Sequence, residues 1–293
     1  MANLKEIRNR ISSVDSTMQI TSAMKMVSAA KLKRAQDAVT WMRPYANKLH
    51  EILAGLSASL DLSENKFASD REVKNVLLVC VTSNRGLCGA FNNNVIKKTL
   101  KIAKEDYPDK NVSILSIGKK ATDAFKRSQY NIKGSYLPKN TDQLWNDLTF
   151  ENVAPVAEKI MKAFTDGYID KVVLVYNHFK NVATQIPTVE QFLPVQEPEL
   201  DENKKISLDY IFEPSKEEIV TELIPKSLKI QLYSALLDSI AGEHGARMTA
   251  MHKATDNASE LNKALKLEYN KARQAAITNE ILEIVGGAEA LNG

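Results

Sequence analysis

LKEIRNRISSVDSTM, residues 4–18, opens a line of apolar side chains spaced alternately three and four residues apart. This heptad spacing is typical of a helix that packs along a second helix. The line runs through Leu4, Ile7, Ile11, Val14, Met18, Leu32, Ala35, Val39, Met42, Ala46, Leu49, Leu53, Leu56 and Leu60. In its middle it falls on Thr21, Lys25 and Ser28, where we expect the helix to continue with looser packing. The pattern predicts a coiled-coil helix over residues 1–60.

The C-terminal end carries a matching line of residues. It comprises Ile230, Tyr233, Leu237, Ile240, His244, Arg247, Met251, Ala254, Ala258, Leu261, Leu265, Ala272 and Ala275. Alanine lets two helix axes approach closely, but it buries little apolar surface at roughly 25 cal/mol per Å². We predict that residues 215–293 form a second helix, antiparallel to the first. At about 1.5 Å per residue, the two helices would measure roughly 80 and 100 Å.

Residues 73–212 have a different texture, in which short β-branched runs alternate with amphipathic stretches. That alternation predicts a Rossmann-like α/β domain with a mostly parallel sheet. The predicted strands are Val76–Ser83, Val112–Ile117, Lys171–Tyr176, Ala183–Phe192 and Ile206–Ile211. The predicted helices are Ala90–Glu105, Lys119–Ser128 and Phe150–Thr165. Residues 61–72 form the first linker, and the second begins near Glu213 and Pro214, where Ser215 can cap the following helix.

The segment from Thr82 to Asn92 joins the first predicted strand to its helix, where a nucleotide-binding fold would hold phosphate. Its two glycines, Gly86 and Gly89, are three residues apart and match neither phosphate-binding glycine pattern. The favoured interpretation is a tight structural turn that these glycines permit. A phosphate site remains the alternative, and with it an enzyme that has a nucleotide-binding α/β domain and a helical dimerisation stalk.

The composition, with 44% hydrophobic, 26% charged and 6% aromatic residues, is typical of a well-solvated, helix-rich chain. The net charge of +3 is too small to indicate nucleic-acid binding. Residues 1–60 nevertheless carry nine Lys or Arg against four Asp or Glu. Around Lys25 and Lys31–Arg34 this excess predicts either a solvated helix face or attraction to an acidic partner surface. We expect no membrane span and no signal peptide, because the apolar runs are only a few residues long.

No catalytic or metal-binding group of residues stands out in the sequence. The four histidines, His50, His178, His244 and His252, are scattered, and we expect no catalytic residue, cofactor or metal. The cysteines, Cys80 and Cys88, are expected to be a buried strand residue and a loop thiol without a disulfide between them.

Five motifs in this order resemble the family of F-type ATP synthase γ subunits along the whole chain. They are LKEIRNRI (Leu4–Ile11), ITSAMKMV (Ile20–Val27), SNRGLCG (Ser83–Gly89), EHGARMTAM (Glu243–Met251) and YNKARQAAITNEI (Tyr269–Ile281). The chain is similar to the bacterial form, which lacks the cysteine-bearing regulatory insert of chloroplasts. The resemblance implies a central rotor shaft that is not catalytic on its own.

The resemblance also implies partners and a location. The helical pair would turn inside a ring of three α and three β subunits, and the α/β domain would sit against ε and the membrane-embedded c-ring. The rotor would couple ion translocation to ATP synthesis or hydrolysis. It would be peripheral, on the cytoplasmic face of the bacterial plasma membrane.

Individual contacts follow from the motifs in the same way. Met24, Lys25 and Arg247 match positions that face the β subunit. Arg273, Gln274, Thr278 and Glu280 match a polar cluster that contacts catch regions of β and α, and Gln274 and Thr278, four apart, would share one helix face. Tyr210 and Glu213 match the foot that touches c-ring loops. An apolar tip at Ile277, Ile281, Ile284 and Val285 would suit a bearing.

Overall fold

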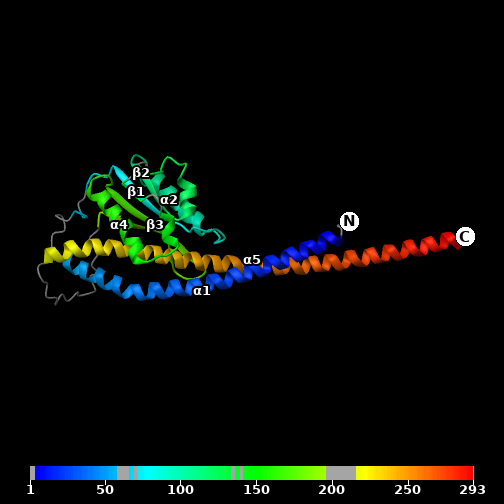
Figure 1. The fold of residues 1–293 in the computed structure, drawn as a ribbon. Helices are drawn as coiled ribbons and strands as arrows, with labels where there is room; N and C mark the ends of the chain where they lie inside the picture. The colour runs from blue at the N-terminus through cyan, green and yellow to red at the C-terminus, as the bar shows by residue number, and fades with distance from the viewer. Residues whose placement is uncertain are drawn as a thin grey trace. The chain divides into compact units, whose positions relative to one another are not determined.

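The computed structural model describes residues 4–57, 66–68, 71–132, 136–138, 141–195 and 216–292 (Figure 1). Two long helices, α1 (Leu4–Ser57) and α5 (Lys216–Asn292), enclose the rest of the chain in sequence. The strands are β1 (Asn75–Val81), β2 (Asn111–Ile117), β3 (Lys171–Phe179) and β4 (Gln185–Leu193). The shorter helices are α2 (Phe91–Glu105), α3 (Lys119–Phe125), the 3-10 helix η2 (Thr141–Trp145) and α4 (Phe150–Thr165).

The chain divides into two compact units, and each of the long helices contributes to both. The helical unit combines Met1–Ser28 with Met248–Gly293, and the sheet unit is Ala29–Arg247. Each is described by itself below.

The sheet unit is built on four strands in the order β2-β1-β3-β4. β1 is parallel to both of its neighbours, and β4 is antiparallel to β3. The expected mostly parallel sheet is therefore confirmed. Because β2 and β3 lie on opposite sides of β1, the carboxyl ends of β1 and β3 form a topological switch point, where nucleotide-binding folds place their ligand.

Alternate residues of β1 enter two separate apolar cores. Leu77, Val79 and Val81 face a core that α4 and the first part of α5 complete. Val76, Leu78 and Cys80 face the opposite core, which α2 and α3 complete. A strand buried on both faces reads as a continuous apolar run, as the sequence NVLLVCV does.

Helix α5 belongs to the core of the sheet unit as well as to the helical pairing. Ile224, Leu228 and Leu232, spaced four residues apart, lie buried in the core shared with α4. Figure 1 shows this yellow part of α5 running along the sheet beside α4. The N-terminus of α4 is fixed by Thr149, whose hydroxyl accepts a hydrogen bond from the Asn152 backbone N–H at 3.4 Å.

The helical unit is held in an antiparallel register by three polar pairs. The Arg8 guanidinium donates to the Tyr269 hydroxyl at 2.7 Å, the Asn262 amide donates to Asp15 at 2.7 Å, and the Thr255 hydroxyl donates to that of Thr21 at 2.8 Å. From one pair to the next, the residue number rises by about one heptad on α1 and falls by about one heptad on α5. This register leaves residues 274–292 beyond Leu4, the first described residue of α1.

The polar middle of α1 stays helical, as predicted, and its seam residues Thr21 and Ser28 are buried. Their hydroxyls donate to carbonyls of the same helix, from Thr21 to Met18 at 3.1 Å and from Ser28 to Met24 at 2.7 Å. Ser16, Thr17 and Thr40 make the same kind of bond four residues back. These hydroxyl groups therefore donate within their own helix.

The structure departs from the sequence expectations in a few places. On α5 the seam passes through Asn262, which is 5% exposed, whereas the predicted Leu261 is 51% exposed. Ala275 is exposed because it lies beyond the end of the pairing. The helix η2 was not predicted. The predicted strand Ile206–Ile211, the Ser215 cap and most of the first linker lie outside the described residues.

Candidate functional site

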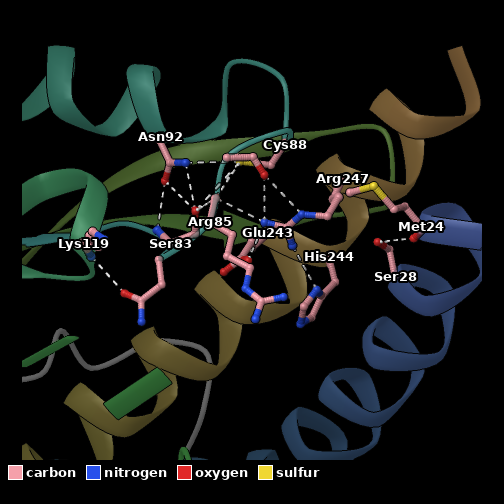
Figure 2. Close-up of polar contacts among 12 residues, drawn as sticks. Met24, Ser28, Ser83, Arg85, Cys88, Asn92, Lys119, Glu243, His244 and Arg247 are labelled. Atoms are coloured by element: carbon pink, nitrogen blue, oxygen red, sulfur yellow. Dashed lines mark hydrogen bonds and ion pairs between the residues drawn. The ribbon is translucent and has the colours of Figure 1, made fainter. Parts of the chain in front are cut away.

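The loop after β1, Thr82–Ala90, lies at the switch point and is closed by its own polar side chains. The Asn92 carboxamide accepts from the Ser83 backbone N–H at 2.9 Å and donates to the Ser83 hydroxyl at 2.8 Å. The same amide lies 3.2 Å from the Cys88 sulfur (Figure 2). Cys80 and Cys88 are free and buried, which confirms the expected absence of a disulfide. Burial raises the pKa of the Cys88 thiol despite the nearby Arg247 cation.

The guanidinium of Arg247, on α5, occupies the space in front of this loop. It donates to the carbonyl oxygens of Arg85 and Gly86 at 3.3 Å and forms an ion pair with Glu243 at 2.7 Å (Figure 2). Arg247 and Glu243 are each only 8% exposed. A phosphate loop would present backbone N–H groups to an anion. This loop instead presents carbonyl oxygens to a cation supplied by the chain itself.

Burial controls the protonation of the groups around Arg247. It raises the pKa of Glu243, while the Arg247 cation, together with Lys31 and Arg85, acts in the opposite direction. It lowers the pKa of His244 to about 4, with help from Arg247 and Lys31. The His244 Nδ1 lies 3.3 Å from an Arg247 nitrogen, so a neutral imidazole can accept from that cation. The cluster thus favours a neutral histidine beside an ion pair.

Two glycines let α5 approach the carboxyl end of the sheet closely. A Cβ on Gly242 would lie 3.1 Å from the Phe91 ring, and one on Gly245 would lie 3.3 Å from the Phe179 ring. This part of α5 therefore fills the place where a nucleotide-binding fold holds its ligand. The geometry favours the structural interpretation of the loop.

The loop backbone needs one of its two glycines for its conformation. Gly89 has φ +59°, in the left-handed region that favours glycine. Gly86 does not have a positive φ, and Leu87, which is 64% exposed, takes φ +61° instead. The expectation that Gly86 and Gly89 both serve the turn therefore holds for Gly89 alone.

The residues expected to face the β subunit differ in how the structure places them. Met24 and Lys25 lie half-buried on the helical-unit part of α1. Arg247 belongs to the sheet unit, where its guanidinium binds the loop carbonyls and Glu243. Arg247 thus has a structural role inside the chain that its motif alone did not indicate.

The predicted polar cluster near the C-terminus is exposed to solvent on α5. Arg273, Gln274, Thr278 and Glu280 are all exposed. The Thr278 hydroxyl donates to the Gln274 backbone carbonyl at 2.9 Å, so these two residues do lie on one face of the helix.

The expected apolar tip lies among them. Ile277, Ile281, Ile284 and Val285 are between 48% and 66% exposed. Large side chains this exposed, side by side on one helix, indicate a surface that another molecule covers.

Tyr210 and Glu213, the expected foot, lie outside the described residues. In the part of the chain that the structure does describe, no group of His, Cys, Asp or Glu side chains could hold a metal ion. Over the same residues, no helix has the length and hydropathy needed to cross a membrane.

Sequence reasoning missed several polar pairs that join distant segments. His178 on β3 contacts Asp238 on α5 at 2.5 Å, and the Gln231 amide on α5 donates to Glu190 on β4 at 2.6 Å. The Glu243–Arg247 pair did have a signal, because opposite charges four residues apart on a helix face each other. The pairs between distant segments have no such local signal.

Comparisons with known proteins agree with the fold. A protein-family model described as ATP synthase matches residues 3–291. The ATP synthase gamma chain of Christiangramia forsetii is 62% identical over 294 residues, and that of Flavobacterium johnsoniae is also 62% identical over 294 residues. Each alignment covers 100% of this chain and 100% of the relative.

Two solved structures are similar to this chain. The central stalk and c-ring structure of Tetrahymena thermophila mitochondrial ATP synthase has a chain with 25% identity and a TM-score of 0.55, covering 80% of this chain and 99% of that one. The rotor structure of the Euglena gracilis mitochondrial ATP synthase has a chain with 20% identity and a TM-score of 0.62, covering 94% of this chain and 98% of that one. The second likeness concerns the fold alone. With the family match and the full-length relatives, the conclusion is that this chain belongs to the ATP synthase γ-chain family.

Proposed function

We propose that this chain transmits torque between a membrane-embedded ring of c subunits and a hexamer of three α and three β subunits. As a γ chain it is the central-stalk rotor subunit of an ATP synthase and is not catalytic by itself. The torque would couple ion translocation to ATP synthesis or hydrolysis, which take place on other subunits.

The observation that carries this proposal is the C-terminal end of α5, residues 274–292. It extends past Leu4 in the register of the helical unit and exposes three isoleucines and a valine on one side of the helix. A shaft end that turns past three equivalent neighbours needs an apolar surface without strong, directional contacts to any one of them. This surface provides that property.

Polar residues at the root of this tip would sense the angle of the shaft. Arg273, Gln274, Thr278 and Glu280 present charges and an amide on exposed positions, suited to contacts with α and β that form at some angles only. Met24 and Lys25 would face β from α1. Arg247, whose guanidinium binds the loop after β1, would touch β with its remaining surface.

Energetics sets what the shaft has to deliver. Moving a two-state site from 1:99 to 99:1 needs about 5.5 kcal/mol of differential interaction. One charge crossing 100 mV supplies roughly 2.3 kcal/mol, so a few ions per step suffice if a stiff element carries the torque. An asymmetric shaft would favour a different β conformation at each of its angles.

The segment before α5 would meet the membrane part of the complex. Tyr210 and Glu213 are our candidates for contact with c-ring loops, and ε would bind beside them. The chain would then be a peripheral protein on the cytoplasmic face of the bacterial plasma membrane. The enzyme alternative receives no support from the loop after β1, because the carbonyls of Arg85 and Gly86 already bind Arg247.

Native mass spectrometry tests the proposal directly. The chain is affinity-purified from gently solubilised membranes of its own host. One copy with three each of two large nucleotide-binding subunits, together with ε, supports the rotor assignment. A monomer or homodimer that binds nucleotide by itself would overturn it and favour the enzyme.

A further inference from the structure

Asp15 and Asn262 form a polar pair at the seam of the helical unit, and Asn262 is its buried member. Asn262 is 5% exposed and its amide nitrogen lies 2.7 Å from an Asp15 carboxylate oxygen. Met251, Ala258 and Leu265, on the same face of α5, are also buried. On α5, Asn262 therefore interrupts a line of buried apolar residues.

The apolar residues alone do not determine the register of these helices. They repeat every three or four residues on both helices, so a shift by one heptad again places apolar side chains opposite each other. Several of them on α5 are alanines, including Ala254, Ala258 and Ala272, whose small side chains fit many opposite neighbours. Something other than apolar packing has to select one register.

A shift by one heptad would separate the polar partners. Read along the observed register, it would place Asp15 level with Thr255 or Tyr269 and leave the buried Asn262 amide opposite Ser22 or Arg8. Neither residue offers the carboxylate that the Asn262 amide binds in the observed register, and the loss of a charged acceptor is disfavoured. The same shift would move the C-terminal tip by about 10 Å along the helix axis.

We propose that the Asp15–Asn262 hydrogen bond is the register lock of the helical unit, and that it fixes how far residues 274–292 reach beyond the first helix. A polar residue at one seam position is known to specify register in coiled coils generally. Its consequence for torque transmission rests on the rotor function proposed above. The structural part, the choice of one register, stands independently of that function.

The test uses the full chain in its assembled complex. In one variant both partners become leucine, Asp15→Leu with Asn262→Leu, which keeps the seam apolar and the helices paired. Spin labels attached to Ser12→Cys and Lys266→Cys, both exposed positions in level parts of the two helices, report their axial offset by pulsed electron resonance. The parent should give one narrow distance distribution. The leucine variant should add a second population, offset by about 10 Å along the axis.

Two further variants make the result specific. The exchange of partners, Asp15→Asn with Asn262→Asp, keeps one donor and one acceptor at the same place and should restore a single register. The double variant Arg8→Leu with Tyr269→Leu removes an exposed polar pair of the same register and should leave a single register. Slippage in this control as well would overturn the assignment of the lock to the Asp15–Asn262 pair.

The remaining outcomes separate the lock from the rotor function. A single, unchanged distance distribution in the leucine variant refutes the lock. Slippage accompanied by fewer ions pumped per ATP hydrolysed supports both the lock and its role in coupling. If the parent complex shows no ATP-driven ion pumping that depends on this chain, the rotor function fails, and the distance measurement still decides the lock.

Discussion

The Arg247→Met substitution should loosen the loop after β1, because it leaves the buried Glu243 carboxylate without its ion-pair partner. Methionine keeps much of the volume of the arginine stem but removes every donor. The carbonyls of Arg85 and Gly86 lose their partner, and Glu243, 8% exposed, is left without its counter-charge. Breaking a buried ion pair by removing one partner costs about 3–5 kcal/mol.

The loss should depend on pH in a definite direction. Burial already raises the pKa of Glu243 above its ordinary value, so the folded state holds this proton more tightly than the unfolded state. Without Arg247 that pKa rises further, and His244, whose pKa Arg247 helps to lower, becomes easier to protonate beside it. The penalty is therefore complete above the raised pKa of Glu243 and shrinks as the pH falls toward the unfolded value of about 4.3.

Hydrogen exchange of the backbone amides of residues 83–92, measured by mass spectrometry in the assembled complex, reports the local opening. A loss of about 3 kcal/mol corresponds to exchange more than about 100-fold faster at neutral pH, after correction for the intrinsic rate. The acceleration should be smaller near pH 5. Lys253→Met, an exposed change on the same helix, is the matched control and should leave these amides unchanged. Equal exchange in parent and Arg247→Met, or an acceleration that grows on acidification, would refute the reasoning.

Three further predictions concern the loop, its histidine and the α1 contact. Gly89→Ala should destabilise the chain by about 1 kcal/mol because of its φ of +59°, whereas Gly86→Ala should change stability by less than about 0.5 kcal/mol in the same thermal-unfolding assay. His244 should show no NMR titration above about pH 5, because its folded pKa of about 4 lies below the unfolded value of 6.5. It should therefore reduce stability as the pH falls from 6.5 to about 4, and His244→Gln should remove this dependence of stability on pH. Met24→Lys should weaken coupling, because it adds a cation next to Lys25 that can form an unwanted ion pair with β worth about 0.2–1 kcal/mol. An unchanged number of ions pumped per ATP hydrolysed would count against this contact.

Much of the fold could be predicted from local patterns. The strands β1 to β4 and the helix α4 follow from apolar runs, amphipathic spacing and the polar residues between them, and their ends fall within three residues of the predictions. In α1, every predicted seam position from Leu4 to Leu53 is at least partly buried. Periodicity carries this information because one side of each element must be buried.

The rest depended on partners that are distant in the sequence. Leu261 and Asn262 both lie near the seam of α5, and hydropathy favours the leucine, but Asp15 across the interface selects the asparagine. Arg247 reads as a surface contact in its motif, while the carbonyls of a loop about 160 residues away hold it inside the chain. Neither acceptor can be identified from the residues beside its donor.

The hydroxyls of α1 that donate to their own helix affect how this helix contacts a neighbouring surface. The exposed residues Ser16 and Thr17 have each donated their hydroxyl proton to a carbonyl of their own helix. A neighbouring surface that slides past them meets hydroxyl oxygens that can accept a hydrogen bond but have no free proton to donate. Alanine in their place would have no side-chain donor and a smaller volume, whereas lysine would add a charged donor. This stretch of helix therefore presents polar residues whose hydroxyl protons are already bonded.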